Sequence, residues 1–546
     1  VKIEPHDHNV GTCYRCHTTV EPRVSKQWFV KMEELAGPAI EAVKSGKTRF
    51  VPEHFDKTYY HWLENIKDWC ISRQLWWGHR IPAFYCDCCN EVVVTKENKA
   101  VCPKCGKEMR QDPDTLDTWF SSALWPFSTL GWPDKTEELD YFYPTSTLVT
   151  GYDIIFFWVI RMMFSGIEHT GKAPFNTILI HGLVRDSQGR KMSKSLGNGI
   201  DPLEVIDKYG ADALRLTLIT GNAPGNDMRF YWERVESSRN FANKVWNASR
   251  FIMMNLDKAE VRDVDVTELT DADKWILSKV NTLAKDVTDN MENYDLGVAV
   301  QKIYDFIWEE FCDWYIEMVK PRLWNDDDTT KVAALYTLKT VLINSLKLLH
   351  PYMPFITEEI FCNIQDEEES IMISSWPVYD ETNNFAAEEK AIETIKEAVR
   401  NIRNLRADMN VAPSRKALVY VVTASEDVKN IFNNSLGFFG TLAYASEVKV
   451  QADKAGIPED AVSTVIPDAV IYIPFAELVD IDKEIERLKK EEGRLQGEIK
   501  RCNGMLNNER FTSKAPKAKI DEEKAKLVKY TQMLEQVTER LATLSK

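Results

Sequence analysis

Two lysines and two serines stand close together in Lys191-Met-Ser-Lys-Ser195, between Gly189 and Gly197. Ammonium groups neutralise the charge of phosphates, and hydroxyl and backbone N–H groups orient phosphate oxygens. Glycines on both sides suit a loop that closes over its ligand. On composition alone, a solvated basic turn accounts for these residues equally well. The segment therefore predicts either a polyphosphate-binding loop or such a turn.

Cysteines in pairs form a second group. Cys86 and Cys89 form one C-x2-C pair, and Cys102 and Cys105 form another after twelve intervening residues. Four thiolates at this spacing are typical of a tetrahedral structural zinc site in a ribbon. We predict that these four bind zinc and that Cys88 is spare. A set of buried free thiols is the alternative.

Cys13 and Cys16, followed by His17, make a third pair near the start of the chain. The pattern C-x2-C-H is formally a c-type haem attachment motif. Haem attachment requires export and an axial ligand, and the sequence supports neither. Half of a second zinc site is the preferred interpretation.

A short strand precedes the lysine-containing loop and should position it. Thr177–His181 is apolar and β-branched over the length of a buried strand, and glycines follow it. From about residue 230 to 365, apolar residues recur at three- and four-residue spacing, as in a helical bundle. The acidic stretch 364–384 is a predicted linker, and a small α/β unit is expected at 385–475.

The end of the chain carries two heptad-like apolar series, Leu478–Leu506 and Leu527–Leu544, separated by a helix break at Thr512–Pro516. This pattern predicts an antiparallel coiled-coil hairpin, with a dimerisation coil as the alternative. Residues 477–546 hold 16 Lys and Arg against 14 Asp and Glu, so this arm is weakly positive.

Composition narrows the class of protein. A hydrophobic fraction of 44% and a charged fraction of 28% are ordinary for a folded chain, and a net charge of −16 argues against coating nucleic acid with bulk positive charge. Local basic patches stay possible. The most apolar run, Ile154–Ile160, is too short to span a membrane, and the first residues do not resemble a signal peptide. We therefore expect a cytoplasmic protein without a membrane segment.

The segment 191–195 resembles the signature loop of the class I aminoacyl-tRNA synthetases. Four further passages, 67–78, 116–125, 151–158 and 238–246, are similar to the branch for large hydrophobic amino acids. Within that branch, 127–133 and the terminal hairpin resemble the valyl-tRNA synthetase family. The isoleucyl family is the close alternative, but its members usually end in a zinc-bearing tail.

The resemblance implies a multidomain fold that combines α/β and all-α parts. It places the end of an editing insert at 1–25, with Cys13 and Cys16 as the half zinc site. The expected domains that follow are the C-terminal half of a Rossmann-like catalytic domain at 26–229 with a zinc ribbon at 84–110, a helical-bundle anticodon-binding domain at 230–384, a small α/β extension at 385–476 and a coiled-coil tRNA-binding arm at 477–546.

The resemblance also implies residue roles. Lys191, Ser193 and Lys194 would act in catalysis by stabilising the pyrophosphate that leaves ATP. The expected ATP-binding residues are Gly151, Asp153, His181, Gly182, Leu183, Met192 and Lys194. Trp119, Ile154 and Trp158 would shape the amino-acid pocket, although core packing is the preferred interpretation of Ile154 and Trp158 from the residues alone.

The implied activity is ATP- and Mg²⁺-dependent activation of valine, followed by transfer to tRNA(Val), by a monomer with structural zinc. The family's other signature, His-Ile-Gly-His, does not occur in the 546 residues. We therefore expect the C-terminal portion of such an enzyme, unable to form valyl-adenylate alone. A non-catalytic tRNA-binding fragment is the alternative from a different functional class.

Overall fold

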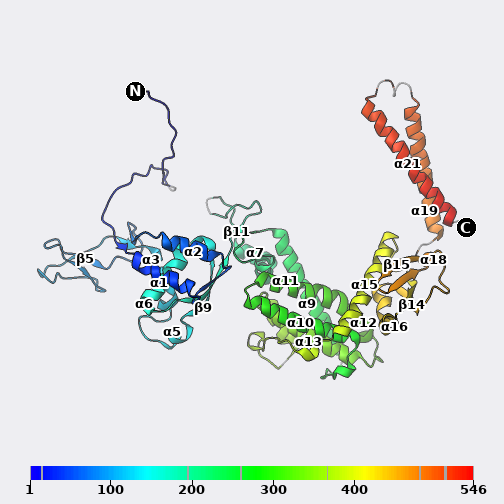
Figure 1. Ribbon diagram of the computed structural model, residues 1–546, viewed down its shortest axis with the longest axis horizontal. Coiled ribbons are helices and arrows are strands. Elements are labelled where there is room, and N and C mark those ends of the chain that lie inside the picture. The colour runs from blue at the N-terminus through cyan, green and yellow to red at the C-terminus, as the bar shows by residue number, and fades with distance from the viewer. Residues whose placement is uncertain are drawn as a thin grey trace. The chain divides into compact units, whose positions relative to one another are not determined.

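The structure is a computed structural model in two compact units (Figure 1). It describes residues 2–13, 16–193, 196–258, 261–365, 367–478, 481–508, 513 and 515–544. The first unit comprises Val1–Lys208, Leu218–Val235 and Asn290–Val298, and the second comprises Tyr209–Thr217, Glu236–Asp289 and Ala299–Lys546.

A three-stranded parallel sheet forms the centre of the first unit. Its order is β2 (Arg49–Val51), β10 (Phe175–His181) and β9 (Thr145–Gly151). The predicted strand at Thr177–His181 is therefore confirmed as most of β10. Because the strands are parallel and aligned, Gly151 and His181 lie opposite each other at the same edge. Among the described residues, β10 is the one pairing partner of β9.

Helices cover one face of this sheet. Ile178 and Ile180 of β10 share a buried core with apolar side chains of α1 (Glu33–Lys44), α2 (Phe55–Glu64) and α6 (Ile160–Thr170). Alternation along a strand sends these side chains to one face and their neighbours to the other. The strand ends are thus held by a packed α/β layer.

Short elements complete the first unit. Three small antiparallel sheets combine β6 (Val92–Val94), β5 (Ala83–Tyr85) and β7 (Arg110–Gln111), then β4 (Ser72–Arg73) with β8 (Thr115–Leu116), and β1 (Phe29–Val30) with β3 (Trp69–Cys70). A short parallel pair joins β11 (Val184–Arg185) to β12 (Met228–Arg229). The remaining helical elements are α3 (Thr118–Ser122), α4 (Trp125–Ser128), α5 (Glu137–Phe142), the 3-10 turn η1 (Tyr152–Ile154), the π-helical turn η2 (Ile155–Val159) and α7 (Pro202–Tyr209).

Long helices dominate the chain from residue 211 to 364, as the apolar periodicity predicts. They are α8 (Ala211–Ile219), α9 (Trp232–Leu256), α10 (Asp271–Glu292), α11 (Leu296–Asp305), α12 (Ile316–Trp324), α13 (Lys331–Leu349) and α14 (Pro354–Ile364), with η3 (Val266–Glu268) and the π-helical η4 (Phe306–Tyr315). Among the described residues, α13 is the one helix long and apolar enough to cross a membrane, and 61% of that apolar window is buried inside the protein.

The stretch predicted as a linker at 364–384 packs against the helices. Its 3-10 turns η5 (Ile371–Ile373) and η6 (Glu381–Asn383) follow α14. Ile371 is buried, and the backbone N–H and carbonyl of Asp380 both bond the Asn281 amide at 2.8 Å. These contacts hold the segment against the helices, so its acidic side chains form an exposed surface.

A small α/β unit follows, as expected from the sequence. Its sheet has the order β14 (Ala445–Gln451), β13 (Ala417–Val422), β16 (Ala469–Ile473) and β15 (Val462–Ile466), and its helices are α15 (Ala386–Asp408), α16 (Glu426–Asn434), α17 (Leu436–Leu442) and α18 (Phe475–Leu478).

The last two helices, α19 (Ile481–Leu506) and α21 (Lys517–Leu544), lie side by side (Figure 1). Leu488, Leu495 and Cys502 are buried along α19, and Arg501 lies 3.6 Å from Glu523 of α21. The predicted break at Thr512–Pro516 falls partly outside the described residues.

Candidate functional site

The edge where β9 and β10 end gathers most residues of the lysine-containing site. β9 leads from Gly151 straight into the turn that carries Asp153. A Cβ atom added at Gly151 would stand 2.9 Å from Asp153 Oδ1, so glycine gives this carboxylate its room. The Asp153 side chain is 34% exposed and faces solvent at the strand ends.

Asp227 organises the turn after β10. Its Oδ1 accepts the backbone N–H of Leu183 at 2.7 Å, and its Oδ2 accepts the Tyr152 hydroxyl at 3.1 Å and the Arg185 guanidinium. Burial alone would raise the pKa of Asp227, but these donors outweigh it and hold the pKa below the usual range. Sequence reasoning missed this residue, because no local pattern connects it to a position 44 residues earlier.

Gly182 lies where two chain segments cross. A Cβ atom placed on it would stand 1.8 Å from the carbonyl oxygen of Asn226, closer than atoms can approach. The parallel pairing of β11 with β12 runs through the same place. Glycine is therefore required at position 182 for the backbone to come this near its neighbour.

The lysine-containing loop is closed by side-chain hydrogen bonds. Asp186 accepts the Asn198 amide at 3.0 Å and the Arg190 backbone N–H at 2.8 Å, and with Asn198 as the main donor these bonds hold the pKa of Asp186 well below its usual range. Asn198 Oδ1 in turn accepts the backbone N–H of Ser193 at 2.9 Å. Asp186 and Asn198, both missed in the sequence, thus connect the two ends of the loop.

Lys191 projects from this loop to the strand ends. Its Nζ lies 3.1 Å from Asp153 Oδ2, which brings a residue predicted to act in catalysis next to one predicted to bind ATP. Met192 is half-buried beside it. The predicted residue Lys194 lies outside the described residues, as does Ser195.

An apolar cavity of about 300 Å³ adjoins the same turn. His181 and Gly182 form part of its wall, with Val149 and Leu179 from the two strands and Tyr294 from the segment 290–298. The volume and the lining suit a flat ring. Together the strand ends offer a carboxylate, an ammonium group, backbone donors and an apolar slot within one unit.

The residues predicted for the amino-acid pocket form an aromatic cluster. Trp119 stacks on Phe157 with ring centroids 5.9 Å apart, and Trp158 lies 5.7 Å from Trp125. Ile154 and Trp158 do not share an α-helical face, because Ile154 ends a 3-10 turn and Trp158 belongs to the π-helical turn η2. The shared helical face is therefore wrong, whereas Trp158 does pack against the buried core, as the core-packing interpretation expects.

A buried ion cluster supports α3. Asp117 caps this helix and accepts Trp69 Nε1 at 3.1 Å and Arg73 Nη2 at 2.7 Å. Arg161 lies 3.6 Å from the same carboxylate and 3.9 Å over the Trp69 ring, and desolvation lowers its pKa to about 10. These contacts fix the backbone that carries Trp119.

The four predicted zinc ligands converge. The sulfur atoms of Cys86, Cys89, Cys102 and Cys105 all lie within 4.8 Å of one another, at 3.3–4.0 Å for the close pairs. Sulfurs at the corners of a tetrahedron with Zn–S bonds of about 2.3 Å would stand about 3.8 Å apart. Backbone N–H groups of Cys88 and Cys89 lower the pKa of Cys86 to about 6 and favour its thiolate.

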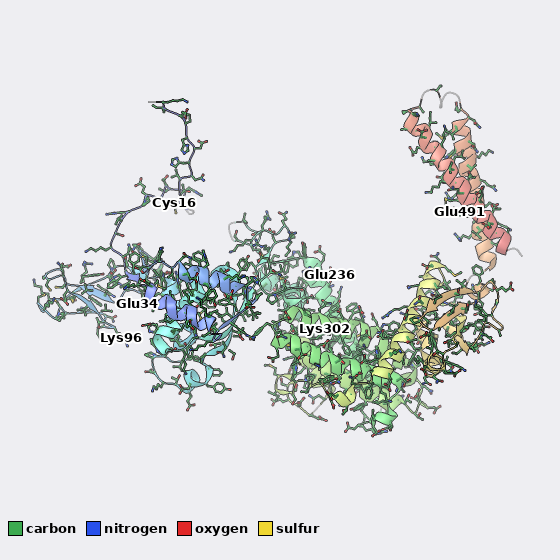
Figure 2. All side chains as sticks on the ribbon, viewed as in Figure 1. Cys16, Glu34, Lys96, Glu236, Lys302 and Glu491 are labelled. Atoms are coloured by element: carbon green, nitrogen blue, oxygen red, sulfur yellow. The ribbon has the colours of Figure 1, made fainter. Side chains whose placement is uncertain are left out.

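Cys13 and Cys16 do not join this group. They lie on the extended N-terminal stretch, where Figure 2 labels Cys16. Within the part of the chain that the structure describes, the four ribbon cysteines form the one cluster of three or more ligand side chains, so Cys13 and Cys16 gain no third ligand.

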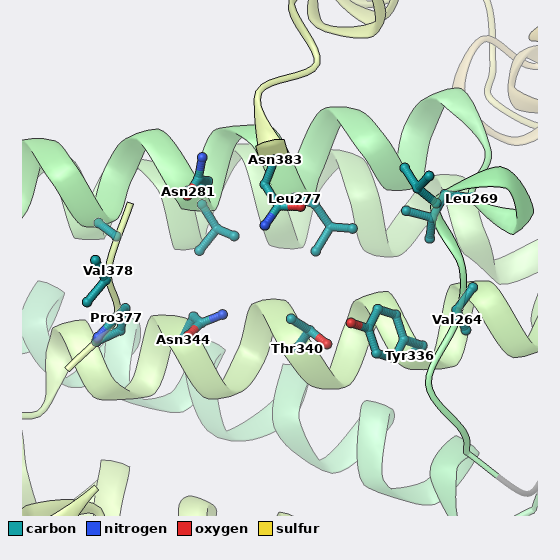
Figure 3. A pocket seen from close by; sticks show the side chains of 13 residues that line it. Val264, Leu269, Leu277, Asn281, Tyr336, Thr340, Asn344, Pro377, Val378 and Asn383 are labelled. Carbon is teal, nitrogen blue, oxygen red and sulfur yellow. The ribbon is translucent and has the colours of Figure 1, made fainter. Parts of the chain in front are cut away.

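Cavities also lie in the described part of the second unit. One, of about 210 Å³, lies between α10 and α13, and Figure 3 shows Tyr336, Thr340 and Asn344 of α13 facing Leu277 across it. The other is an open groove along α9. Its lining includes three amides and one ring on that helix, Asn240, Asn243, Asn247 and Phe251, and two lysines, Lys244 and Lys320.

Three family descriptions match successive parts of the chain. They are tRNA synthetases class I (I, L, M and V) at 3–231, the anticodon-binding domain of tRNA ligase at 273–421 and the valyl tRNA synthetase tRNA binding arm at 480–545. Over these residues the chain is similar to the class I aminoacyl-tRNA synthetases.

Relatives within this family are named valine--tRNA ligase. Those of Clostridium perfringens and Clostridium tetani are 60% and 59% identical over all of this chain, which spans 62% of the length of each. Two solved synthetase structures share the fold. The ternary LeuRS–tRNA–LeuAMS complex of Agrobacterium radiobacter K84 matches with a TM-score of 0.50 and 20% identity, over 61% of this chain and 46% of its own. Mycobacterium tuberculosis methionyl-tRNA synthetase with methionyl-adenylate matches with 0.51 and 18%, over 64% and 65%.

Proposed function

We propose that this chain forms part of a valine–tRNA ligase that activates valine with ATP and transfers it to tRNA(Val). The observation that carries the proposal is the valyl-specific arm at 480–545, together with relatives of that name at up to 60% identity. It favours the valyl over the isoleucyl alternative. The valine carboxylate would attack the α-phosphorus of ATP, and the bond to pyrophosphate would break. A hydroxyl of the terminal ribose of tRNA would then attack the valyl carbonyl, and AMP would leave.

The strand-end residues have clear roles in this reaction. Asp153 would accept from the ribose hydroxyls, and the backbone of His181, Gly182 and Leu183 would line the adenine beside the apolar cavity. Lys191, paired with Asp153 at 3.1 Å, would exchange that carboxylate for phosphate oxygens and neutralise the leaving pyrophosphate. Lys194, Ser193 and Met192 would act from the same loop, with Mg²⁺ on the phosphates.

Zinc in the cysteine ribbon would be structural. Four cysteine thiolates leave no open coordination position for substrate. Tyr85, at the end of β5 and next to Cys86, donates its hydroxyl to Asp112 at 2.7 Å, and that carboxylate also accepts Trp28 Nε1 at 3.0 Å. Bound zinc would therefore stiffen the ribbon, and the hydrogen bonds of Asp112 connect that ribbon to Trp28 outside the metal site.

The groove on α9 is a candidate surface for unpaired tRNA bases. Asn240, Asn243 and Asn247 recur on one exposed face, with Phe251 one turn further. Amide edges and an aromatic ring are suited to reading splayed bases. Arg406, from the arginine-rich helix α15, is buried and donates to the carbonyls of Ala412 and Arg415, so its guanidinium is engaged inside the protein.

Valine-dependent ATP–pyrophosphate exchange tests the activity. The 546-residue chain should show none, because it lacks the His-Ile-Gly-His signature. A chimera that joins the preceding part of the Clostridium perfringens relative to this chain should show exchange. Among the described residues β9 pairs with β10 alone, so its other edge can accept further parallel strands. In that chimera Lys191→Ala should lower the rate about a hundredfold, whereas the exposed Lys135→Ala should not. Exchange that depends on isoleucine, or its absence from the chimera, would contradict the proposal.

A further inference from the structure

The cavity between α10 and α13 lies inside the helical part of the second unit and is separate from the groove on α9 (Figure 3). Its volume is about 210 Å³. Leu277, Val280 and Ala284 form its apolar wall on α10, and the last two are buried. Val378 also lines the cavity and is 82% exposed, so a ligand can enter from solvent beside it.

Three polar side chains of α13 form the opposite wall. Tyr336, Thr340 and Asn344 are spaced four residues apart and therefore lie on one face of the helix, toward the cavity (Figure 3). All three are half-buried. In the described part of the chain, no hydrogen bond joins any of these side chains to another residue. A few polar groups that converge on an otherwise apolar cavity are typical of a site for a small molecule.

Contacts outside the cavity hold its walls in place. The segment after α14 is bonded to α10 at two points, because both backbone groups of Asp380 bond the Asn281 amide at 2.8 Å and Trp376 Nε1 donates to Thr288 at 2.9 Å. On the face of α13 that points away from the cavity, Leu338 is fully buried. Both helices are thus fixed from their other sides, and the space between them exists before a ligand binds.

The lining indicates the charge of the ligand. None of the 13 lining residues is charged. A charged group would lose its hydration in such a site without gaining a counter-charge, which is strongly unfavourable. Valine, ATP and pyrophosphate are all charged, so the ligand differs from the substrates of the proposed function. A base of an RNA would bring phosphates, and these need neighbouring cations.

The volume indicates the size of the ligand. An apolar cavity of about 150 Å³ binds benzene. The 210 Å³ between α10 and α13 therefore hold one six-membered ring with a small substituent. The row of hydroxyl and amide groups on α13 requires that this substituent form hydrogen bonds, since these groups would otherwise lose their contact with water unpaired.

We propose that this cavity is a binding site for an uncharged ring that carries a carboxamide or hydroxyl group. The ring lies against Leu277 and Ala284, and its polar group bonds the row on α13, with Thr340 at the centre. Because the ligand contacts both helices, its binding stabilises the helical part of the second unit. The site is independent of the proposed function and adds a second kind of ligand to the chain.

Two probes of the same shape and different charge test the site, 4-fluorobenzamide and 4-fluorobenzoate. Each is titrated with the 546-residue chain and followed by the broadening of its fluorine NMR signal. The uncharged amide should bind with a Kd on the order of 1 mM, and the carboxylate at least tenfold more weakly. Saturating amide should also raise the melting temperature of the chain, whereas the carboxylate should not.

Three variants locate the binding. Ala284→Leu fills part of the cavity and should weaken binding of the amide at least tenfold. Thr340→Val keeps the shape of the side chain but removes its hydroxyl, and should weaken binding about fivefold. Thr282→Val, on the exposed face of α10, is the matched control and should bind like the parent chain. The melting curve of each variant without probe verifies that it folds.

Equal affinity for the two probes would overturn the proposal, because the uncharged lining would then not select the ligand. So would unchanged affinity for the amide in a folded Thr340→Val variant, even if Ala284→Leu fails to fold. None of these measurements involves adenylate formation. Failure of exchange in the chimera would contradict the proposed function and leave this binding result standing.

Discussion

The cysteine ribbon and the strand-end site of the first unit are assembled in opposite ways. The ribbon draws its four sulfurs from two turns between Cys86 and Cys105. The strand-end site joins Asp153, Leu183, Lys191 and Asp227, which come from separate strands and loops. A cluster built from neighbouring residues can order or unfold by itself, whereas a site built across a sheet shares the stability of that sheet. A substitution that disrupts the ribbon should therefore unfold the ribbon alone, whereas a substitution near Asp227 should also destabilise the sheet.

The largest expected effect is the loss of the ribbon itself. Cys102→Ala should remove the zinc and the ordered structure of residues 84–111, because metal binding supplies most of the folding free energy of such small sites. Metal analysis together with hydrogen exchange measures both. Cys88→Ala, outside the cluster, is the control. A zinc content that Cys102→Ala leaves unchanged would remove the metal assignment, and lost protection at β9 would contradict local unfolding.

A methyl group at position 182 gives the next largest effect. Gly182→Ala places its Cβ against the Asn226 carbonyl and should destabilise the β10–β11 region by about 3 kcal/mol, since backbone must move. Gly37→Ala meets nothing within 4 Å and serves as the matched control. Hydrogen exchange at Leu183 and Met228 reports the change. Equal protection in both variants would show that the two segments do not cross this closely.

Removal of the Asp227 carboxylate comes third. Asp227→Ala removes the carboxylate that accepts from the Leu183 N–H and from Arg185, and should cost about 2 kcal/mol in the opening of the sheet edge at β10 and β11. Because the folded pKa of Asp227 is lowered, its stabilisation is full above the unfolded value near pH 4 and is lost as the pH falls through the folded pKa. Protection of the Leu183 amide should decrease below about pH 4 in the parent chain. A pH-independent profile there would contradict the role of this carboxylate.

The smallest effect tests the loop closure alone. Asn198→Ala removes the acceptor for the Ser193 N–H and the amide donor to Asp186, and should raise the exchange rate of the Ser193 amide about fivefold, or about 1 kcal/mol. The protection of β10 should not change. Asn65→Ala, which loses a bond to the carbonyl of His61 at a helix end, is the comparison. Loss of protection throughout β10 would show that the loop and the sheet open together.

These differences explain what could be predicted from the sequence. Two C-x2-C pairs specify a ligand set by spacing alone, so the geometry of Cys86 to Cys105 agrees with the expectation. Strand β10 and the long helices were predictable because apolar periodicity reports burial. The hydrogen bonds of Asp227 could not be predicted, because they form only when β12 pairs with β11 in the folded protein. Catalytic and binding roles of the residues at the strand ends stay predictions.

Two segments that look exposed in the sequence are held by contacts inside the protein. Arg406 stands in an Arg-rich helix, which in sequence resembles a nucleic-acid contact, yet it donates to the carbonyls of Ala412 and Arg415. The acidic stretch before residue 384 looked like a linker, but the Asn281 amide bonds both backbone groups of Asp380. In both cases a side chain bonds to backbone groups, a contact that no side-chain pattern reveals.

The π-helical turn at Ile155–Val159 has a consequence for how this pocket can vary. A π-helical turn contains about one residue more than an α-helical turn, so deleting one residue there would leave an ordinary helix. Because both kinds of turn close 360°, the side chains on either side of the deletion would keep their orientation, with the hydrophobic core of α6 unchanged. A single codon loss could thereby remove one aromatic side chain beside Trp119 while the rest of the helix keeps its place.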